Sequence, residues 1–248
     1  MDDVERAEFH ARLSRDLLAQ KDEPLTLQRI VELAVQVVPG CDWAGISLRT
    51  AETPAKAAAS TGETVHRADQ LQDSLQQGPC YDSATDNETH IVRDTMADSR
   101  WPAWSERVAE LGIRSVLSVQ LVGTEGDLYG ALNLYAEQTD AFSRSDLDEA
   151  LLFAAHAGGA IGVSREVSGL REALRSRHLI GVAQGMLIQR YDLTLDQAFA
   201  VLARHSQESN IKLRDVAARI VEGGQLLGQE DLGGSGPESQ LVAGGTSG

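Results

Sequence analysis

The chain of 248 residues is long enough for one or two domains, and its 42% hydrophobic content is ordinary for a globular protein. Its net charge of −15, acidic first residues and lack of a twenty-residue apolar run argue against a secretory signal and a membrane span. Cys41 and Cys80 form no CxxC pair, so neither a disulfide framework nor a zinc site is expected. We therefore expect a cytoplasmic protein that does not contact membranes.

The first two thirds of the chain alternate between helix and strand patterns. An apolar stripe over residues 25–38 predicts a helix that Pro39-Gly40 stops. Strands are predicted at 43–48, 55–60, 113–122 and 127–135. The last two flank Gly123-Thr-Glu-Gly126, a short turn of the kind that joins antiparallel strands. The pattern predicts an α+β domain, an antiparallel sheet with flanking helices.

Three short stretches of this region resemble the GAF domain family: Gly78-Pro79-Cys80, Gly130 to Tyr135, and Ala141 to Asp146. The resemblance implies a pocket on one face of the sheet that can hold a small molecule. Members that bind cyclic nucleotides carry an Asn-Lys pair and a later Asp-Glu pair. Here Leu134 and Leu147 replace two of those charged residues. The sequence identifies no cofactor, and an unknown small-molecule ligand of the GAF domain is left as a possibility.

Cys80 is the candidate sensor residue of this domain. It precedes a predicted helix over 81–87, whose N-terminal dipole would favour the thiolate. Such a thiolate could sense redox state or carry a chromophore. The alternative is a small side chain packed behind Pro79, because unpaired cysteines are usually buried.

Motifs of catalysis and metal binding are missing from the sequence. We find no phosphate-binding glycine loop, nucleophile elbow or HExxH pair, and the histidines are not clustered. We therefore expect a protein that is not an enzyme and holds no metal.

The connector over 146–190 is helix-prone, but glycines weaken it at several positions. Gly158-Gly159, Gly162 and Gly169 each weaken a helix by about 1 kcal/mol relative to alanine, which predicts a hinge. The apolar residues around them could form a seam with a second subunit, or could pack on the chain's own first domain. These residues are Ile161, Val163, Val167, Leu170 and Leu174.

The C-terminal third predicts three helices with local excess of positive charge. Thr194 and Gln197 have the spacing of a capping box at the start of a second helix over 195–206. Asn210 marks the start of a third helix, and Gly223-Gly224 its end. Residues 171–219 carry a net charge of +3, which leaves −18 for the rest. This asymmetry favours a nucleic-acid partner, although solvated helix faces would look similar.

This segment closely resembles the ANTAR family of RNA-binding transcription antiterminators. The residues that carry the resemblance are dispersed over all three helices: Ala173, Arg177, Ile180, Gly181, Ala183, Gly185, Met186, Ala198, Phe199, Leu202, Ser206, Asn210, Lys212, Leu213, Arg214, Ala217 and Ile220. The resemblance implies an all-α three-helix bundle that binds a pair of RNA hairpins with six-nucleotide loops. Binding would prevent an overlapping terminator hairpin from forming, and RNA polymerase would be affected only indirectly.

Five polar residues are the RNA-binding candidates. Arg177, Lys212 and Arg214 could meet phosphates and bases, while Ser206 and Asn210 could donate hydrogen bonds or serve as caps. Phe199 is expected in the core rather than stacked on a base, because aromatic side chains tend to be buried. Two RNA loops also favour a homodimer, since two linked bundles gain avidity.

The predicted organisation is a GAF sensor domain with an N-terminal helix over 1–160, an ANTAR domain with its connector over 161–224, and a disordered tail over 225–248. The predicted function is a signal-responsive antiterminator that binds a two-hairpin leader RNA. One alternative is a DNA-binding regulator with helix-turn-helix-like C-terminal helices; another is a GAF-mediated protein-interaction scaffold. The last helix offers only Lys212, Arg214 and Arg219 for a DNA groove, which favours RNA.

Overall fold

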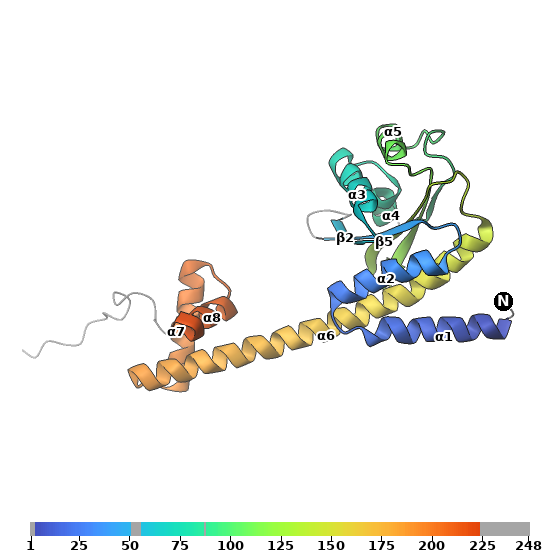
Figure 1. Cartoon of the computed structure of the whole chain (residues 1–248). Coiled ribbons are helices and arrows are strands. Elements are labelled where there is room, and N and C mark those ends of the chain that lie inside the picture. The colour runs from blue at the N-terminus through green and yellow to red at the C-terminus, as the bar shows by residue number, and fades with distance from the viewer. Residues whose placement is uncertain (1–2, 51–55, 87, 224–248) are drawn as a thin grey trace, which may run out of the picture. The chain divides into compact units, whose positions relative to one another are not determined.

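The computed structural model describes residues 3–50, 56–86 and 88–223, and the chain divides into two compact units (Figure 1). The first unit runs to Leu170 and the second begins at Arg171. The predicted tail over 225–248 and the predicted strand residue Ala55 lie outside the described residues.

A five-stranded sheet forms the centre of the first unit. Its strands lie in the order β2-β1-β5-β4-β3, and every neighbouring pair is antiparallel. The bounds are β1 Trp43–Leu48, β2 Lys56–Ser60, β3 His90–Val92, β4 Ser115–Val122 and β5 Leu128–Ala136. The predicted α+β class with an antiparallel sheet is therefore confirmed. Strand β3 was not predicted, because three residues are too few to show an alternating pattern.

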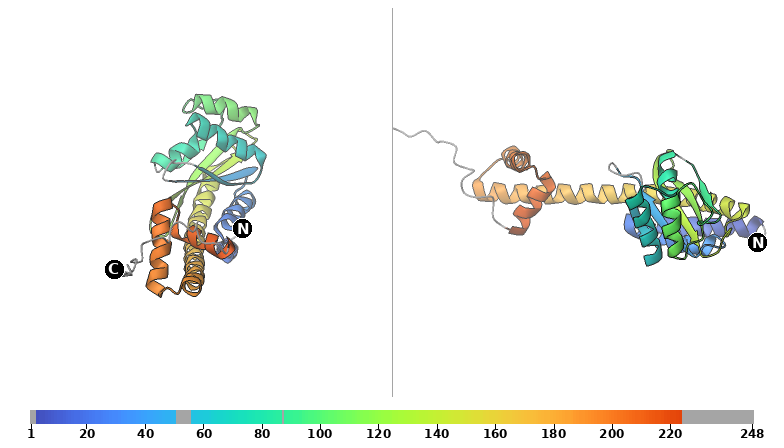
Figure 2. Two further views of the ribbon diagram at one scale, coloured as in Figure 1. Left: turned by 90° about the vertical axis from the view of Figure 1, so that its left-hand side faces the viewer. Right: turned by 90° about the horizontal axis from the view of Figure 1, so that it is seen from above.

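Helices cover both faces of this sheet (Figures 1 and 2). One face carries α2 Glu23–Val37 and the first part of α6 Arg144–Tyr191, with α1 Asp3–Ala19 packed outside them. The other carries α3 Glu63–Leu75, α4 Pro79–Asp86 and α5 Pro102–Glu110. Each face buries its own apolar cluster, so two hydrophobic layers hold the sheet.

Helix α2 shows how the sequence sets these elements. Asp22 caps its N-terminus by accepting a hydrogen bond from the Leu25 amide at 3.3 Å. Apolar residues three or four apart then give the helix one buried face. Val38 ends the helix just before Pro39, and Gly40 follows with a positive φ of 75°.

Helix α6 runs for 48 residues, so none of its glycines ends the helix, and the hinge expected from them stays a prediction. A Cβ atom on Gly158 would lie 2.0 Å from the carbonyl oxygen of Val122, and one on Gly162 would lie 3.1 Å from the Tyr129 hydroxyl. These two glycines therefore permit α6 to pack closely against the end of the β4-β5 hairpin. Of the two expectations for Ile161, packing on the chain's own first domain is the one observed, because its side chain is fully buried in the core of the first unit.

The second unit contains the end of α6 together with α7 Leu195–Ser209 and α8 Leu213–Gly223. Their apolar faces enclose one core: Ala183, Leu187, Ala198, Leu202, Val216, Ala217 and Ile220. The predicted capping box is present, with the Thr194 hydroxyl accepting from the Gln197 amide at 3.3 Å and the Gln197 side chain accepting from the Thr194 amide at 2.8 Å. This arrangement confirms the predicted all-α C-terminal part.

The sequence suggested that Asn210 begins the third helix, but the structure places it elsewhere. It is the C-cap of α7, with a left-handed φ of 53°, and α8 begins three residues later at Leu213. Asparagine tolerates this conformation better than most residues, which explains why a short polar side chain stands here.

Candidate functional site

The five RNA-binding candidates lie on the second unit, but they differ in how they are engaged. Arg177 and Lys212 are exposed to solvent. The Arg214 guanidinium pairs with Glu172 on α6 and lies 3.5 Å from the Asp215 carboxylate. Arg214 thus joins α8 to α6 within the second unit, so its ion pairs with Glu172 and Asp215 give it a structural role.

Ser206 and Asn210 shape the turn between α7 and α8. The Ser206 hydroxyl donates to the Ile211 carbonyl at 2.6 Å, and the Ile211 amide donates to the Ser206 carbonyl at 3.1 Å. The backbone N–H of Asn210 donates to the carbonyls of Gln207 and Ser206 in the last turn of α7. Both residues therefore hold the backbone that presents Lys212, immediately before α8.

Phe199 departs from the sequence expectation. Its side chain is 45% exposed on α7, rather than buried in the core. Ala198 and Leu202 occupy the buried face, and each helical residue turns by about 100°, so the neighbour of Ala198 points away from the core centre. Taking those two positions as the helix's buried face would have revealed this from the sequence. Leu195, one turn earlier, is also exposed, at 62%.

A buried polar chain lies between the sheet and helices α3 and α4 of the first unit. The Tyr135 hydroxyl donates to Asp69 Oδ1 at 3.0 Å. Gln72 donates to the Tyr135 hydroxyl at 3.4 Å and accepts from the Cys80 amide at 2.9 Å. All four residues are at most 5% exposed. No periodic pattern in the sequence indicates these hydrogen bonds, because Asp69 and Tyr135 are 66 residues apart.

Asp69 is the exceptional member of that chain. Burial raises the pKa of its carboxyl from 3.8 to about 7, against the opposing effect of the Tyr135 hydrogen bond. Its second oxygen, Oδ2, is buried and has no hydrogen-bond partner among the described residues. A protonated carboxyl at this position would still have a proton available for an acceptor, and an ionised one would accept a donor.

Cys80 lies inside the first turn of α4 rather than before the helix. The side chain is 1% exposed, and burial raises the pKa of its thiol to about 12, with the Asp69 charge acting in the same direction. Burial therefore outweighs any stabilisation of a thiolate by the helix dipole. The structure favours the interpretation of Cys80 as a small packed side chain.

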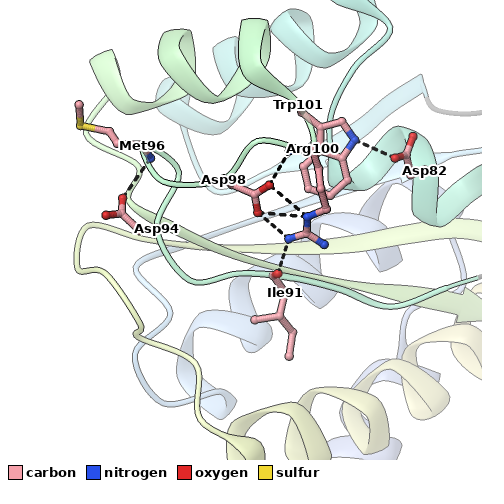
Figure 3. Close-up of polar contacts among 7 residues, drawn as sticks. All are labelled: Asp82, Ile91, Asp94, Met96, Asp98, Arg100 and Trp101. Carbon is pink, nitrogen blue, oxygen red and sulfur yellow. Dashed lines mark hydrogen bonds and ion pairs between the residues drawn. The ribbon is translucent and has the colours of Figure 1, made fainter.

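The loop between β3 and α5 fixes α4 from outside (Figure 3). Trp101 donates from its indole nitrogen to Asp82 Oδ2 on α4 at 2.7 Å. The Arg100 guanidinium lies 4.4 Å from the Trp101 ring centroid, pairs with Asp98 at 2.6 Å and donates to the Ile91 carbonyl at 2.6 Å. These contacts couple the position of α4, and hence of Cys80, to the β3-α5 loop.

Two further properties of the described residues bear on function. Across residues 3–50, 56–86 and 88–223, no three His, Cys, Asp or Glu side chains are grouped to hold a metal ion. None of the helices that the structure describes combines the length and the apolar character needed to cross a bilayer.

Comparison with solved structures finds chains of similar fold. A bacteriophytochrome from R. palustris matches with a TM-score of 0.55 and 16% identity, over 84% of this chain and 47% of that one. The GAF domain of an Acinetobacter phosphoenolpyruvate-protein phosphotransferase matches with a TM-score of 0.52 and 15% identity, over 68% and 99% of the two chains. A free methionine-R-sulfoxide reductase from Neisseria meningitidis, solved with its substrate, matches with a TM-score of 0.50 and 17% identity, over 63% of this chain and 88% of that one. At these identities the likeness shows the fold alone.

Two sequence families match the chain in consecutive segments. The GAF domain family matches residues 20–162, and the ANTAR domain family matches residues 168–221. No protein with a curated description matches the sequence. The first match covers more than half of the 248 residues and the second coincides with the three helices of the second unit. The chain therefore belongs to the GAF domain family and, with its C-terminal ANTAR domain, is a GAF-ANTAR protein.

Proposed function

We propose that this GAF-ANTAR protein is a signal-responsive transcription antiterminator that binds paired RNA hairpins with six-nucleotide loops and so prevents a terminator from forming. The ANTAR domain implies RNA-binding antitermination regulation under a GAF sensor, and this match is the observation that carries the proposal. The charge distribution supports it, since residues 171–219 carry +3 in a chain of net charge −15. Regulators of this architecture are typically not enzymes.

For the RNA contact we propose Arg177 and Lys212 as the phosphate-binding residues. Their exposure supports this role, because each can release counterions when it meets a phosphate. Ser206 and Asn210 contribute by fixing the turn that carries Lys212. Arg214 remains a candidate for RNA contact, although its pairs with Glu172 and Asp215 would have to rearrange.

For the sensor we propose that the GAF domain, over residues 1–160, binds an unidentified small molecule between the sheet and helices α3 and α4. The buried polar chain of Asp69, Gln72 and Tyr135 supports this place, since a packed apolar core would not need these groups. Cys80 belongs to the same chain through its backbone amide. Its buried thiol gives a packing role rather than a redox role.

We further propose that the protein acts as a parallel homodimer joined along α6. Val163, Val167, Leu170 and Leu174 are spaced four, three and four residues apart, as in the seam of a coiled coil. Val163 is 43% exposed, Leu170 60% and Leu174 65%, which is high for apolar side chains on one helix face. Glu166 and Arg171 flank this stripe five residues apart, the spacing of ion pairs between parallel helices.

A binding assay with defined nucleic acids tests the proposed function. The purified full chain is titrated into a two-hairpin RNA with six-nucleotide loops, the same RNA with its loop sequences scrambled, and a DNA duplex of equal length. We expect tight binding to the first RNA and binding at least about tenfold weaker to the others, the difference that about 1.4 kcal/mol of specific contact produces. Preference for the duplex would instead support the DNA-binding regulator, and no binding to any of the three would support the scaffold.

Dimerisation is tested separately by measuring mass in solution. Leu170→Glu places a charge in the proposed seam, and Leu25→Glu makes the same change at a 59% exposed leucine on α2 as a matched control. The parent and the control should sediment as dimers and the Leu170 variant as a monomer. A monomeric parent, or a dimer that survives the Leu170 substitution, would refute this arrangement.

A further inference from the structure

Leu195 and Phe199 form an exposed apolar surface on α7. These two side chains are 62% and 45% exposed and lie one helical turn apart, so they form one apolar patch. Ala198, which precedes Phe199, and Leu202, three residues after it, are instead fully buried in the core. Burying the patch would gain free energy only if a partner covers it, because α7 has no other way to remove it from water.

Helix α6 provides polar and small residues beside this patch. The Gln184 side chain donates to the Leu195 carbonyl at 3.3 Å, which places this side of α6 against the start of α7. Gly181 and Arg177 precede Gln184 by three and seven residues and share its side of the helix. A Cβ atom on Gly181 would have nothing within 4 Å, so the surface next to the patch is open.

The composition of this surface selects its occupant. Helix α7 and this side of α6 together carry an aromatic ring, an arginine and an amide, which offer a stacking face, a positive charge and a hydrogen-bond donor, and this combination suits an unpaired nucleotide. A second copy of the chain is a poorer fit. The coiled-coil spacing that ends at Leu174 continues to Arg177 and Gly181, a charge and a residue without a side chain, so the apolar seam stops before the patch.

We infer that Phe199 stacks on an unpaired base of the RNA hairpin loop while Arg177 contacts the adjacent phosphate. This inference rests on the proposed function and specifies the surface that performs it. It assigns base recognition to the α6-α7 surface, whereas Lys212 on the α7-α8 turn contacts the phosphate backbone elsewhere. Leu195 extends the apolar face against which the stacked base lies.

Variants of Phe199 separate stacking from other apolar contact. With the full chain and a two-hairpin RNA, Phe199→Ala should weaken binding by about 5- to 160-fold, the range found when a base loses an aromatic partner. Phe199→Tyr retains a ring and should bind within about twofold of the parent, whereas Phe199→Leu keeps apolar volume but should bind nearly as weakly as Phe199→Ala. Leu25→Ala, an exposed apolar truncation in the first unit, is the matched control and should bind like the parent.

Salt dependence and fluorescence identify the contact that each residue makes. Phe199→Ala should leave the slope of log K against log salt unchanged, while Arg177→Ala should reduce its magnitude by about 0.7 to 0.9 for the one phosphate lost. A 2-aminopurine base placed in the loop should be quenched or shifted by the parent and by Phe199→Tyr, and not by Phe199→Leu. Circular dichroism establishes that each variant retains its helices.

The outcomes distinguish this inference from the function on which it rests. If the parent binds no hairpin RNA, the proposed function itself fails. If the parent binds, but Phe199→Leu or folded Phe199→Ala binds equally well, the function stands and the stacking role is refuted. The assignment would also be overturned if the slope of log K against log salt changed in Phe199→Ala and stayed unchanged in Arg177→Ala.

Discussion

Replacing Asp69 by asparagine should change how the stability of the GAF domain depends on pH. Asp69 on α3 is 5% exposed, and only one of its carboxylate oxygens has a hydrogen-bond partner among the described residues. Burial raises its pKa from 3.8 to about 7. Asparagine has the same shape and can still accept the Tyr135 hydrogen bond, but it does not titrate.

The magnitude follows from the linkage between protonation and folding. The pKa is higher in the folded state, so the unfolded chain releases this proton first and stability falls as pH rises from about 4 to about 7. A difference of about three pKa units corresponds to about 4 kcal/mol in total, and about 3 kcal/mol of this lies between pH 5 and pH 8. Below about pH 4 the full stability of the protonated group is present.

Urea denaturation followed by tryptophan fluorescence measures this effect in the intact chain. All three tryptophans, at positions 43, 101 and 104, lie in the first unit, so their emission reports the unfolding of that unit. The free energy of unfolding of Asp69→Asn, minus that of the parent, should rise by about 3 kcal/mol from pH 5 to pH 8. Asp73→Asn, an exposed carboxyl on the same helix, is the matched control and should leave the parent's pH dependence unchanged.

The comparison between variants removes the contributions of other titrating groups, such as His156, whose pKa burial lowers, with His10 adding to the effect. Parallel stability curves for the parent and Asp69→Asn would refute the reasoning. They would mean that a donor satisfies the ionised carboxylate inside the fold, so that burial no longer raises its pKa.

Four further substitutions test the packing of α6 and the roles of the basic residues. Gly158→Ala places a methyl group 2.0 Å from a sheet carbonyl and should lower the free energy of unfolding by about 1–3 kcal/mol in urea, whereas Gly159→Ala, with nothing within 4 Å, should leave it unchanged or raise it by up to about 1 kcal/mol. Equal effects at both glycines would contradict the close packing. Lys212→Ala should weaken RNA binding and reduce its salt dependence without changing the melting temperature. Arg214→Ala should lower the melting temperature because it breaks the pair with Glu172; an unchanged melting temperature with weakened RNA binding would instead make Arg214 an RNA contact.

Local sequence signals determined much of the architecture. The capping box of Thr194 and Gln197, the helix that ends at Pro39-Gly40 and the hairpin around Gly123 to Gly126 were all readable, because each depends on residues within one or two turns of each other. The residues that resemble the two families identified both domains although they are dispersed, because their identity and order can be read directly from the sequence.

Only the tertiary structure decided the roles of residues whose partners are distant. Gly158 weakens a helix by local propensity, yet it lies where Val122 leaves no room for a side chain. Phe199 has an apolar side chain but is exposed, since Ala198 and Leu202 already occupy the buried face of α7. Burial raises the pKa of the Asp69 carboxyl, and its hydrogen-bond partner Tyr135 is 66 residues away in the sequence. Burial and charge at these positions are properties of the space between elements, which local sequence patterns do not encode.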